Sequence, residues 1–88
     1  MSYRLAENVQ VRKESWGLLF YRQTHHKVSF VRSGDWLSPE HFDGTWTLSG
    51  IVDDIAGRTG APPEVIERTL PGLTDRLIKN RVITDELR

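Results

Sequence analysis

Three histidines and one pair of adjacent aspartates are the residues whose types suggest chemistry. His25, His26 and His41 would suit a metal ion, but adjacent residues in a strand point to opposite faces, and no carboxylate or thiol lies at a recognised ligand spacing. Asp53 and Asp54 would suit acid–base catalysis, but adjacent residues on a helix project about 100° apart. We therefore expect the histidines to be structural or solvated, the aspartates to lie on a solvated helix face, and no metal to be bound.

Nucleophilic catalysis and cofactor binding also lack their usual motifs. The chain has no cysteine, and Ser15, Ser29 and Ser49 lie in no nucleophile motif. The glycines between residues 44 and 72 form no loop that would cradle a phosphate. A chain of 88 residues leaves little room for a deep catalytic cavity. We expect a protein that is not an enzyme and needs no cofactor.

Composition narrows the partners and the compartment. Twelve basic residues balance twelve acidic ones, so the chain lacks the positive field that favours nucleic acids or anionic membranes. The absence of cysteine is compatible with a reducing cytosol. The first residues are too polar for a secretory signal, and no apolar run approaches the length of a membrane span. The sequence thus predicts one soluble, cytoplasmic domain over residues 1–88, with no nucleic acid and no membrane as partner.

The elements that would position a binding site begin with strands. Residues 9–32 predict three consecutive strands, because segments 16–22 and 27–32 are rich in aromatic and β-branched residues and a polar linker, 23–26, separates them. These two segments should form an antiparallel hairpin. A small sheet that buries one face under helices leaves an edge of unpaired N–H and C=O groups, which invites another chain to pair with it.

Helices are expected throughout the rest of the chain, which makes the predicted class α+β. Thr47 can cap a helix that ends at Gly57 or Gly60 and whose apolar residues share one stripe: Leu48, Ile51, Val52 and Ile55. A short helix before it is expected from Ser38 as cap and Pro39 at the first helical position. The sequence therefore predicts an N-terminal three-stranded antiparallel sheet followed by three helices.

The last helix is predicted to be the longest. Pro62 and Pro63 provide its start, and helical spacing continues as far as Asn80 through a series of apolar residues: Val65, Ile66, Leu70, Leu73, Leu77 and Ile78. Pro71 lies inside this series, where a proline removes a backbone hydrogen bond and clashes with the preceding turn. We expect a kink or a break at Pro71, with both halves facing the same core.

Several segments resemble a known family. The strand region contains the run Val11-Arg-Lys-Glu-Ser-Trp-Gly-Leu-Leu-Phe-Tyr21, in which Arg12-Lys-Glu-Ser-Trp-Gly17 leads into the second strand, and then the run Lys27-Val-Ser-Phe-Val-Arg-Ser33. Together these runs resemble the strand region of the small chaperone of the mycofactocin system. Segments 47–56 and 66–83 are similar to the last two helices of the wider group that contains the pyrroloquinoline-quinone peptide chaperone. The resemblance covers about residues 8–83.

The resemblance implies a fold, a function and partners. The fold would be a winged-helix-like domain that recognises precursor peptides, and the domain would be a non-catalytic chaperone in mycofactocin biosynthesis. In that family the leader of a ribosomally made precursor adds as a further strand beside the third strand, in a cleft against the last helix. It is then presented to a radical S-adenosylmethionine (SAM) maturase. The implied partners of this chain are such a leader and such a maturase.

Carried over to this sequence, the resemblance places the peptide site on two segments. The third strand would supply the pairing edge, with Lys27, Ser29 and Val31 on one face and Val28, Phe30 and Arg32 on the other; we expect Val28 and Phe30 to be core. The last helix would supply candidates for the cleft wall: Arg68, Leu70, Leu73, Thr74 and Leu77.

Two alternatives remain open. A winged-helix DNA-binding module would offer basic residues of the last helix to the major groove, namely Arg68, Arg76, Lys79 and Arg81. Interleaved acidic residues and the zero net charge oppose this alternative, as does the short segment after residue 83, which is too short for a wing hairpin. A homodimer that pairs through the exposed sheet edge is the other alternative.

Overall fold

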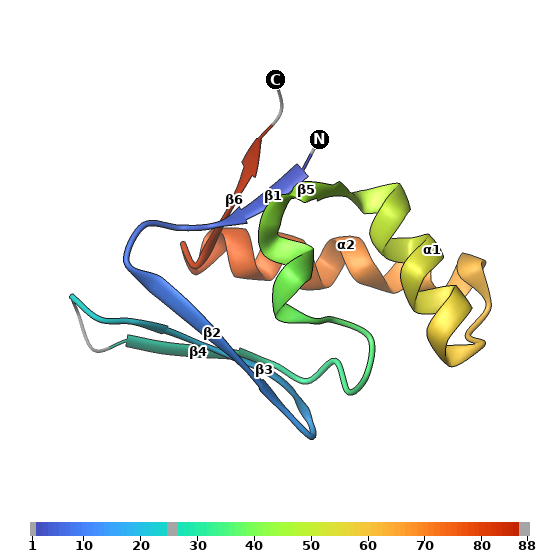
Figure 1. Cartoon of the computed structure of the whole chain (residues 1–88), viewed down its shortest axis with the longest axis horizontal. Helices are drawn as coiled ribbons and strands as arrows, with labels where there is room; N and C mark the ends of the chain where they lie inside the picture. Colours follow the sequence, from blue (N-terminus) through green and yellow to red (C-terminus); the bar gives the residue numbers. More distant parts are fainter. Residues whose placement is uncertain (1, 25–26, 87–88) are drawn as a thin grey trace.

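Two antiparallel three-stranded sheets and two α-helices make up the fold, which is α+β (Figure 1). The structure is a computed structural model, and it describes residues 2–24 and 27–86. The elements follow in chain order: β1 (Ser2–Leu5), β2 (Val9–Glu14), β3 (Gly17–Arg22), β4 (Lys27–Val31), the 3₁₀ turn η1 (Pro39–Phe42), β5 (Asp43–Thr47), α1 (Leu48–Thr59), α2 (Pro63–Lys79) and β6 (Ile83–Glu86).

The sheet β2-β3-β4 confirms the three predicted strands and the predicted hairpin. β3 pairs antiparallel with both neighbours, and a two-residue turn joins Glu14 to its partner Gly17. Gly17 is buried at φ +150°, and a Cβ at this position would lie 2.0 Å from the carbonyl oxygen of Val31. Only glycine therefore lets the chain pass this close to the end of β4.

A second sheet, in the order β5-β1-β6, corrects the expectation of a single N-terminal sheet followed only by helices. β1 pairs antiparallel with β6, so the two ends of the described chain lie side by side, with Ser2 opposite Glu86 (Figure 1). β5 pairs with the other side of β1. These strands have four or five residues each and depend on partners far away in the chain, so local periodicity does not reveal them.

Two of the three predicted helices are present. In α1, the Thr47 hydroxyl accepts a hydrogen bond from the Gly50 N–H at 3.0 Å, and Gly60 ends the helix in the left-handed conformation. α2 continues through Pro71 without the break that was one of the two expected outcomes there.

The prediction of a short helix before α1 is wrong, because this segment forms a 3₁₀ turn. Ser38 and Pro39 start only a single 3₁₀ turn, η1, because the chain enters β5 at Asp43. The turn is nevertheless anchored, since both His41 and Phe42 are buried. It also supplies core contacts, because Phe42 packs edge-to-face against Phe20 with the ring centroids 5.7 Å apart.

The hydrophobic core lies around α2, which contacts β4 on one side and β6 on the other (Figure 1). Ile66, Leu70 and Leu77 of this helix are fully buried, as the predicted apolar stripe requires. Both sheets, η1, α1 and the segments just before η1 and β6 add residues to the same cluster: Tyr3, Val9, Leu18, Phe20, Val31, Leu37, Phe42, Ile51, Val52, Ile55, Val82 and Ile83. Among the described residues, no helix is long and apolar enough to cross a membrane.

Candidate functional site

β4 is an edge strand. β3 pairs with one of its sides, and no strand of residues 2–24 and 27–86 pairs with the other. An unpaired edge presents main-chain donors and acceptors that can be joined by another strand. The alternation of hydrogen-bonded and non-hydrogen-bonded pairs along the sheet, which we call its phase, shows which residues of β4 direct their N–H and C=O groups outward.

The phase is fixed at the end of the β2-β3 ladder. The N–H of Gln23 donates to the carbonyl of Asn8 at 3.2 Å, so these two residues are a hydrogen-bonded pair. In an antiparallel ladder, hydrogen-bonded and non-hydrogen-bonded pairs alternate. The main-chain groups of Tyr21 therefore also point toward β2, while those of Phe20 point toward β4.

This phase carries over to the edge strand. Ser29 lies opposite Phe20, so its N–H and C=O point into the sheet. The residues on either side, Val28 and Phe30, direct their N–H and C=O away from β3. The outward-facing groups of the edge thus belong to Val28 and Phe30.

The side chains of β4 lie on the opposite faces from those predicted. Residues directly opposite each other share a face, and Ser29 and Val31 are paired with the buried Phe20 and Leu18. Val28 and Phe30 project from the other face and are 61% and 45% exposed. Their prediction as core residues is wrong, and Val31, at 2% exposure, is the core residue of this strand.

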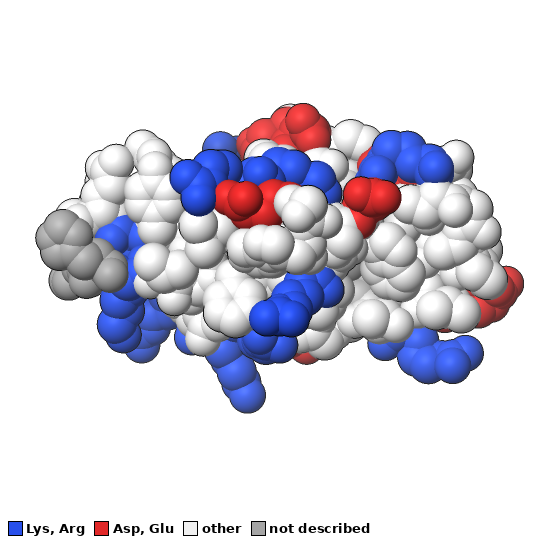
Figure 2. Space-filling view, turned by 90° about the horizontal axis from the view of Figure 1, so that it is seen from below, with Lys and Arg blue, Asp and Glu red and all other residues white. Residues whose placement is uncertain are grey.

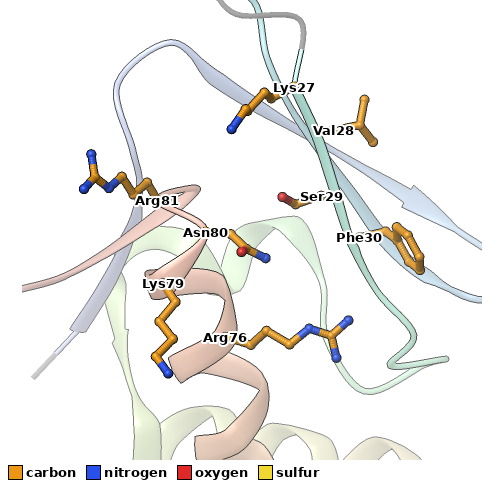
Figure 3. Close-up of a pocket in the computed structure, with 8 residues that line it drawn as sticks. All are labelled: Lys27, Val28, Ser29, Phe30, Arg76, Lys79, Asn80 and Arg81. Carbon is orange, nitrogen blue, oxygen red and sulfur yellow. The ribbon is translucent and has the colours of Figure 1, made fainter.

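A groove of about 640 Å³ runs between β4 and the C-terminal end of α2 (Figure 3). Figure 3 shows the side chains of Lys27 and Ser29 pointing from β4 toward the helix, while Val28 and Phe30 point away from it. The groove is lined by Lys27, Val28, Ser29, Phe30, Arg76, Lys79, Asn80 and Arg81. The main-chain edge of β4 therefore borders a space that is closed on its other side by a helix.

The groove concentrates positive charge in a chain whose net charge is zero. Four of its lining residues are basic, and none of those that the structure describes is acidic. Figure 2 views the molecule from the side of the β2-β3-β4 sheet, and the lower left of this view carries Lys and Arg without Asp or Glu. Most acidic atoms in the view lie in its upper half and at the right-hand end. An anionic ligand is therefore favoured at the groove.

Arg81 ends α2 in an unusual conformation. Its φ is 63°, and its N–H donates to the Ile78 carbonyl at 2.9 Å while that of Val82 donates to the Leu77 carbonyl at 3.2 Å. Glycine is the usual residue at this left-handed position, and a side chain there costs about 1–2 kcal/mol. The Arg22 guanidinium donates to the Arg81 carbonyl and fixes this turn against β3. A strained arginine in a candidate site is a reason to suspect a binding role.

The exposed face of the sheet is apolar near β4. Trp16 and Phe30 pack edge-to-face with ring centroids 5.7 Å apart, and they border a hollow of about 390 Å³ together with Leu19 and Arg32. A second hollow of about 390 Å³ is lined by the apolar parts of Leu19, Tyr21 and Val28, with the polar side chains of Arg12, Arg22 and Gln23 beside them. Phe30 borders the first hollow and Val28 the second, and both residues line the groove, so this face is continuous with the groove.

Only part of the predicted site borders the groove. Lys27, Val28, Ser29 and Phe30 line it, whereas Val31 is buried and Arg32 lies on the apolar face. On the helix, the predicted wall residues are placed elsewhere: Leu70, Thr74 and Leu77 are core, Leu73 packs partly buried against the core, and Arg68 is exposed outside the groove lining.

The helix residues that do line the groove are Arg76, Lys79, Asn80 and Arg81. The sequence prediction did not include them in the peptide site and assigned three of them to the DNA-binding alternative. Their spacing is a usable signal, since residues three and four apart lie on one helix face. Asn80 and Arg81 follow the last helical residue, so the position of the helix end was also needed.

His41 and Asp54 form a structural network. His41 Nδ1 accepts a hydrogen bond from the Ser38 N–H at 3.1 Å, and its Nε2 lies 2.9 Å from an Asp54 oxygen that also accepts from Arg58. Arg58 in turn donates to the carbonyls of Asp35 and Trp36, both at 2.8 Å. The hydrogen bond from His41, followed by that from Arg58, holds the pKa of Asp54 below its ordinary value.

This network supports the loop before η1 and contradicts the solvated position predicted for Asp54; Asp53 is exposed as predicted. His41 has the structural role expected of it, while His25 and His26 lie outside the described residues. No group of three potential metal ligands occurs in the part of the chain that the structure describes.

Comparisons of the chain with protein families, with curated proteins and with solved structures gave no match.

Proposed function

We propose that this chain is a non-catalytic domain that captures an extended peptide by strand addition at β4. The observation that carries the proposal is the outward direction of the Val28 and Phe30 main-chain groups, beside a groove of about 640 Å³. A strand added there would pair with β4 on one side and lie against the C-terminal end of α2 on the other. The β2-β3-β4 sheet would thereby gain a fourth strand.

The resemblance of the strand and helix segments to the mycofactocin chaperone supports an identity for the peptide. We infer that it is the leader of a ribosomally made precursor, which the domain presents to a radical SAM maturase in the cytoplasm. If the second sheet (β1, β5 and β6) is left aside, the order β2, β3, β4, η1, α1 and α2 matches the three strands followed by three helical segments that the resemblance implies. In this chain, η1 would stand in the place of the first helix.

Energetics indicate which part of the site gives affinity. Each main-chain hydrogen bond contributes about 0.5–1.5 kcal/mol net, so the outward groups of two residues supply roughly 2–6 kcal/mol. A micromolar complex requires about 8 kcal/mol after the ordering cost of the peptide has been met. The ladder alone is therefore insufficient, and side chains along the groove must supply the remainder.

DNA binding is the second candidate, and the four basic residues of the groove favour it. The zero net charge of the chain weighs against it, because few phosphates would be neutralised. Self-pairing through β4 is less favoured by the structure, since two antiparallel copies of this strand would bring their basic grooves together.

The test is a titration of chelator-treated protein with a synthetic mycofactocin precursor peptide. We expect one-to-one binding, with backbone amide shifts concentrated in residues 27–30 and 76–81. Shifts confined to residues 2–6 or 35–43 would contradict the proposed site. Binding lost on chelation and restored by a metal, or tight sequence-specific binding of duplex DNA at physiological salt, would contradict the proposed function.

A further inference from the structure

A strand added at β4 would present two different faces to its surroundings. Side chains alternate along a strand, so every second residue of the peptide would point toward α2 and the residues between would point to the outer face of the sheet. Val28 and Phe30 project to the outer face, whereas Lys27 and Ser29 project toward the helix (Figure 3). The two alternating sets of peptide side chains, one toward α2 (the inner half) and one toward the outer face of the sheet (the outer half), therefore contact surfaces of different chemical character.

The inner half meets cations and hydrogen-bond donors. Lys27 lies on β4, and Arg76, Lys79 and Arg81 lie at the end of α2. Figure 3 shows the Arg76 side chain extending toward β4, whereas the side chains of Lys79 and Arg81 extend away from it. Arginine side chains match the planar geometry of a carboxylate by donating two parallel hydrogen bonds. A peptide side chain with a carboxylate is complementary to this wall, whereas a basic side chain is opposed by it.

The outer half meets an apolar surface. Residues of the added strand that lie opposite Val28 and Phe30 would have their Cβ atoms about 4.5–5.5 Å from those of their partners. Beyond Phe30 lies the ring of Trp16, and beyond Val28 lies Tyr21 across the ladder. Aliphatic or aromatic residues at these peptide positions would cover surface that is otherwise exposed to water.

From these two faces we propose that the ligand of the β4 groove is a strand in which acidic residues alternate with apolar ones. The acidic positions face the basic groove, and the apolar positions extend the Trp16–Phe30 face. The matching segment has about five residues, the length of β4. This inference rests on the proposed strand addition and specifies which peptides it selects.

The apolar half of the site distinguishes such a peptide from a nucleic acid. A phosphate backbone would use the basic groove alone, and its affinity would come mostly from charge. It would leave the outward N–H and C=O groups of Val28 and Phe30 without a strand partner. The observed combination of an open ladder, a basic wall and an apolar face favours the peptide.

The test is selection of binders from a random library of peptides about ten residues long, using three forms of the protein. Wild type should enrich peptides with Asp or Glu at alternate positions and apolar residues between them. The double variant Arg76→Glu, Lys79→Glu should lose the acidic preference, and the matched control Arg68→Glu should keep it, because Arg68 is exposed on α2 outside the groove. Circular dichroism checks that each variant folds, and Arg76→Gln, Lys79→Gln replaces the double variant if it does not.

Synthetic peptides then measure how much the acidic and the apolar positions each contribute to affinity. Replacing every Glu of a selected peptide by Gln should weaken binding roughly tenfold, since each of two or three exposed charge pairs contributes roughly a 1.4- to fivefold gain in affinity. The difference should largely vanish above about 0.5 M salt, where charges are screened within a few Å. Replacing the apolar positions by Asn should weaken binding at every salt concentration.

The outcomes separate this inference from the proposed function. Enriched peptides that shift the amides of β4 but show no acidic alternation would overturn the inference and leave strand addition standing. Peptides that bind but shift only amides remote from β4, or a library that yields no binder, would overturn both. A short duplex that displaces the acidic peptide at physiological salt would show that the groove prefers phosphate, and would also overturn the inference.

Discussion

Proline substitutions at two neighbouring residues of β4 should separate peptide binding from fold stability. The N–H of Val28 points away from β3 and its side chain is mostly exposed, so Val28→Pro should destabilise the protein by less than about 1 kcal/mol. The N–H of Ser29 points toward Phe20. Ser29→Pro should cost about 2–4 kcal/mol, because it removes a ladder bond and leaves the facing carbonyl unpaired.

Val28→Pro, the substitution with the smaller effect on stability, should have the more direct effect on peptide binding. Val28→Pro leaves a peptide carbonyl without its donor inside the groove, at a cost of about 1–3 kcal/mol, so the affinity for the precursor peptide should fall at least about tenfold. Val28→Thr, which keeps the N–H and a β-branched shape, is the matched control. Urea midpoints and calorimetric titrations of all three variants give the comparison. Equal unfolding by both prolines, or full affinity in Val28→Pro, would refute the assignment of the outward groups.

The remaining predictions concern the helix end, the β2-β3 turn and the buried network. Arg81→Gly removes a side chain from a left-handed backbone position, so the urea midpoint should stay the same or rise by up to the equivalent of about 1 kcal/mol. The affinity for an acidic peptide should fall. A drop in stability would argue against backbone strain at Arg81. Gly17→Ala should destabilise by more than about 3 kcal/mol in the same assay, since its Cβ would meet the Val31 carbonyl at 2.0 Å; a change below about 1 kcal/mol would contradict that close approach. The pKa of Asp54 is lowered in the folded state, so the ionised carboxylate stabilises the fold above its ordinary pKa of 3.8, and this stabilisation is lost as the pH falls through the folded pKa. Asp54→Asn should therefore lower the urea midpoint at neutral pH and differ less from wild type at about pH 3. A difference in midpoint that does not shrink at about pH 3 would contradict this stabilising role of the carboxylate.

The sequence predicted the local elements well because their signals are local. β-forming residues on both sides of a polar linker predicted the β3-β4 hairpin. The Thr47 cap predicted the start of α1, and Gly60 is one of the two glycines expected to end it. β1, β5 and β6 were missed because they are short and are held by pairing between distant segments, such as Ser2 with Glu86. No periodicity within four or five residues can show that a partner exists.

In the candidate site, too, local features were predicted and features that depend on contacts between distant segments were not. Alternation along β4 correctly predicted two faces, but it does not say which face is buried, and hydrophobicity favoured Val28 and Phe30 over the less apolar set with Ser29. The register decides the faces, because Ser29 lies opposite the buried Phe20. The helix wall was placed too early along α2 for a similar reason. Periodicity found the apolar stripe, while contact with β4 occurs at the end of the helix, where Arg76 and Arg81 lie.

The most direct measurement of the central claim is residue-resolved amide hydrogen exchange on β4, with and without peptide. In the free protein, the amides of Val28 and Phe30 should exchange fast and those of Ser29 and Val31 slowly, because only the latter two point into the ladder. With the precursor peptide at about 100 times its Kd, the exchange of Val28 and Phe30 should slow by roughly 100-fold. Fast exchange of Val28 and Phe30 that the bound peptide does not change would contradict strand addition at this edge.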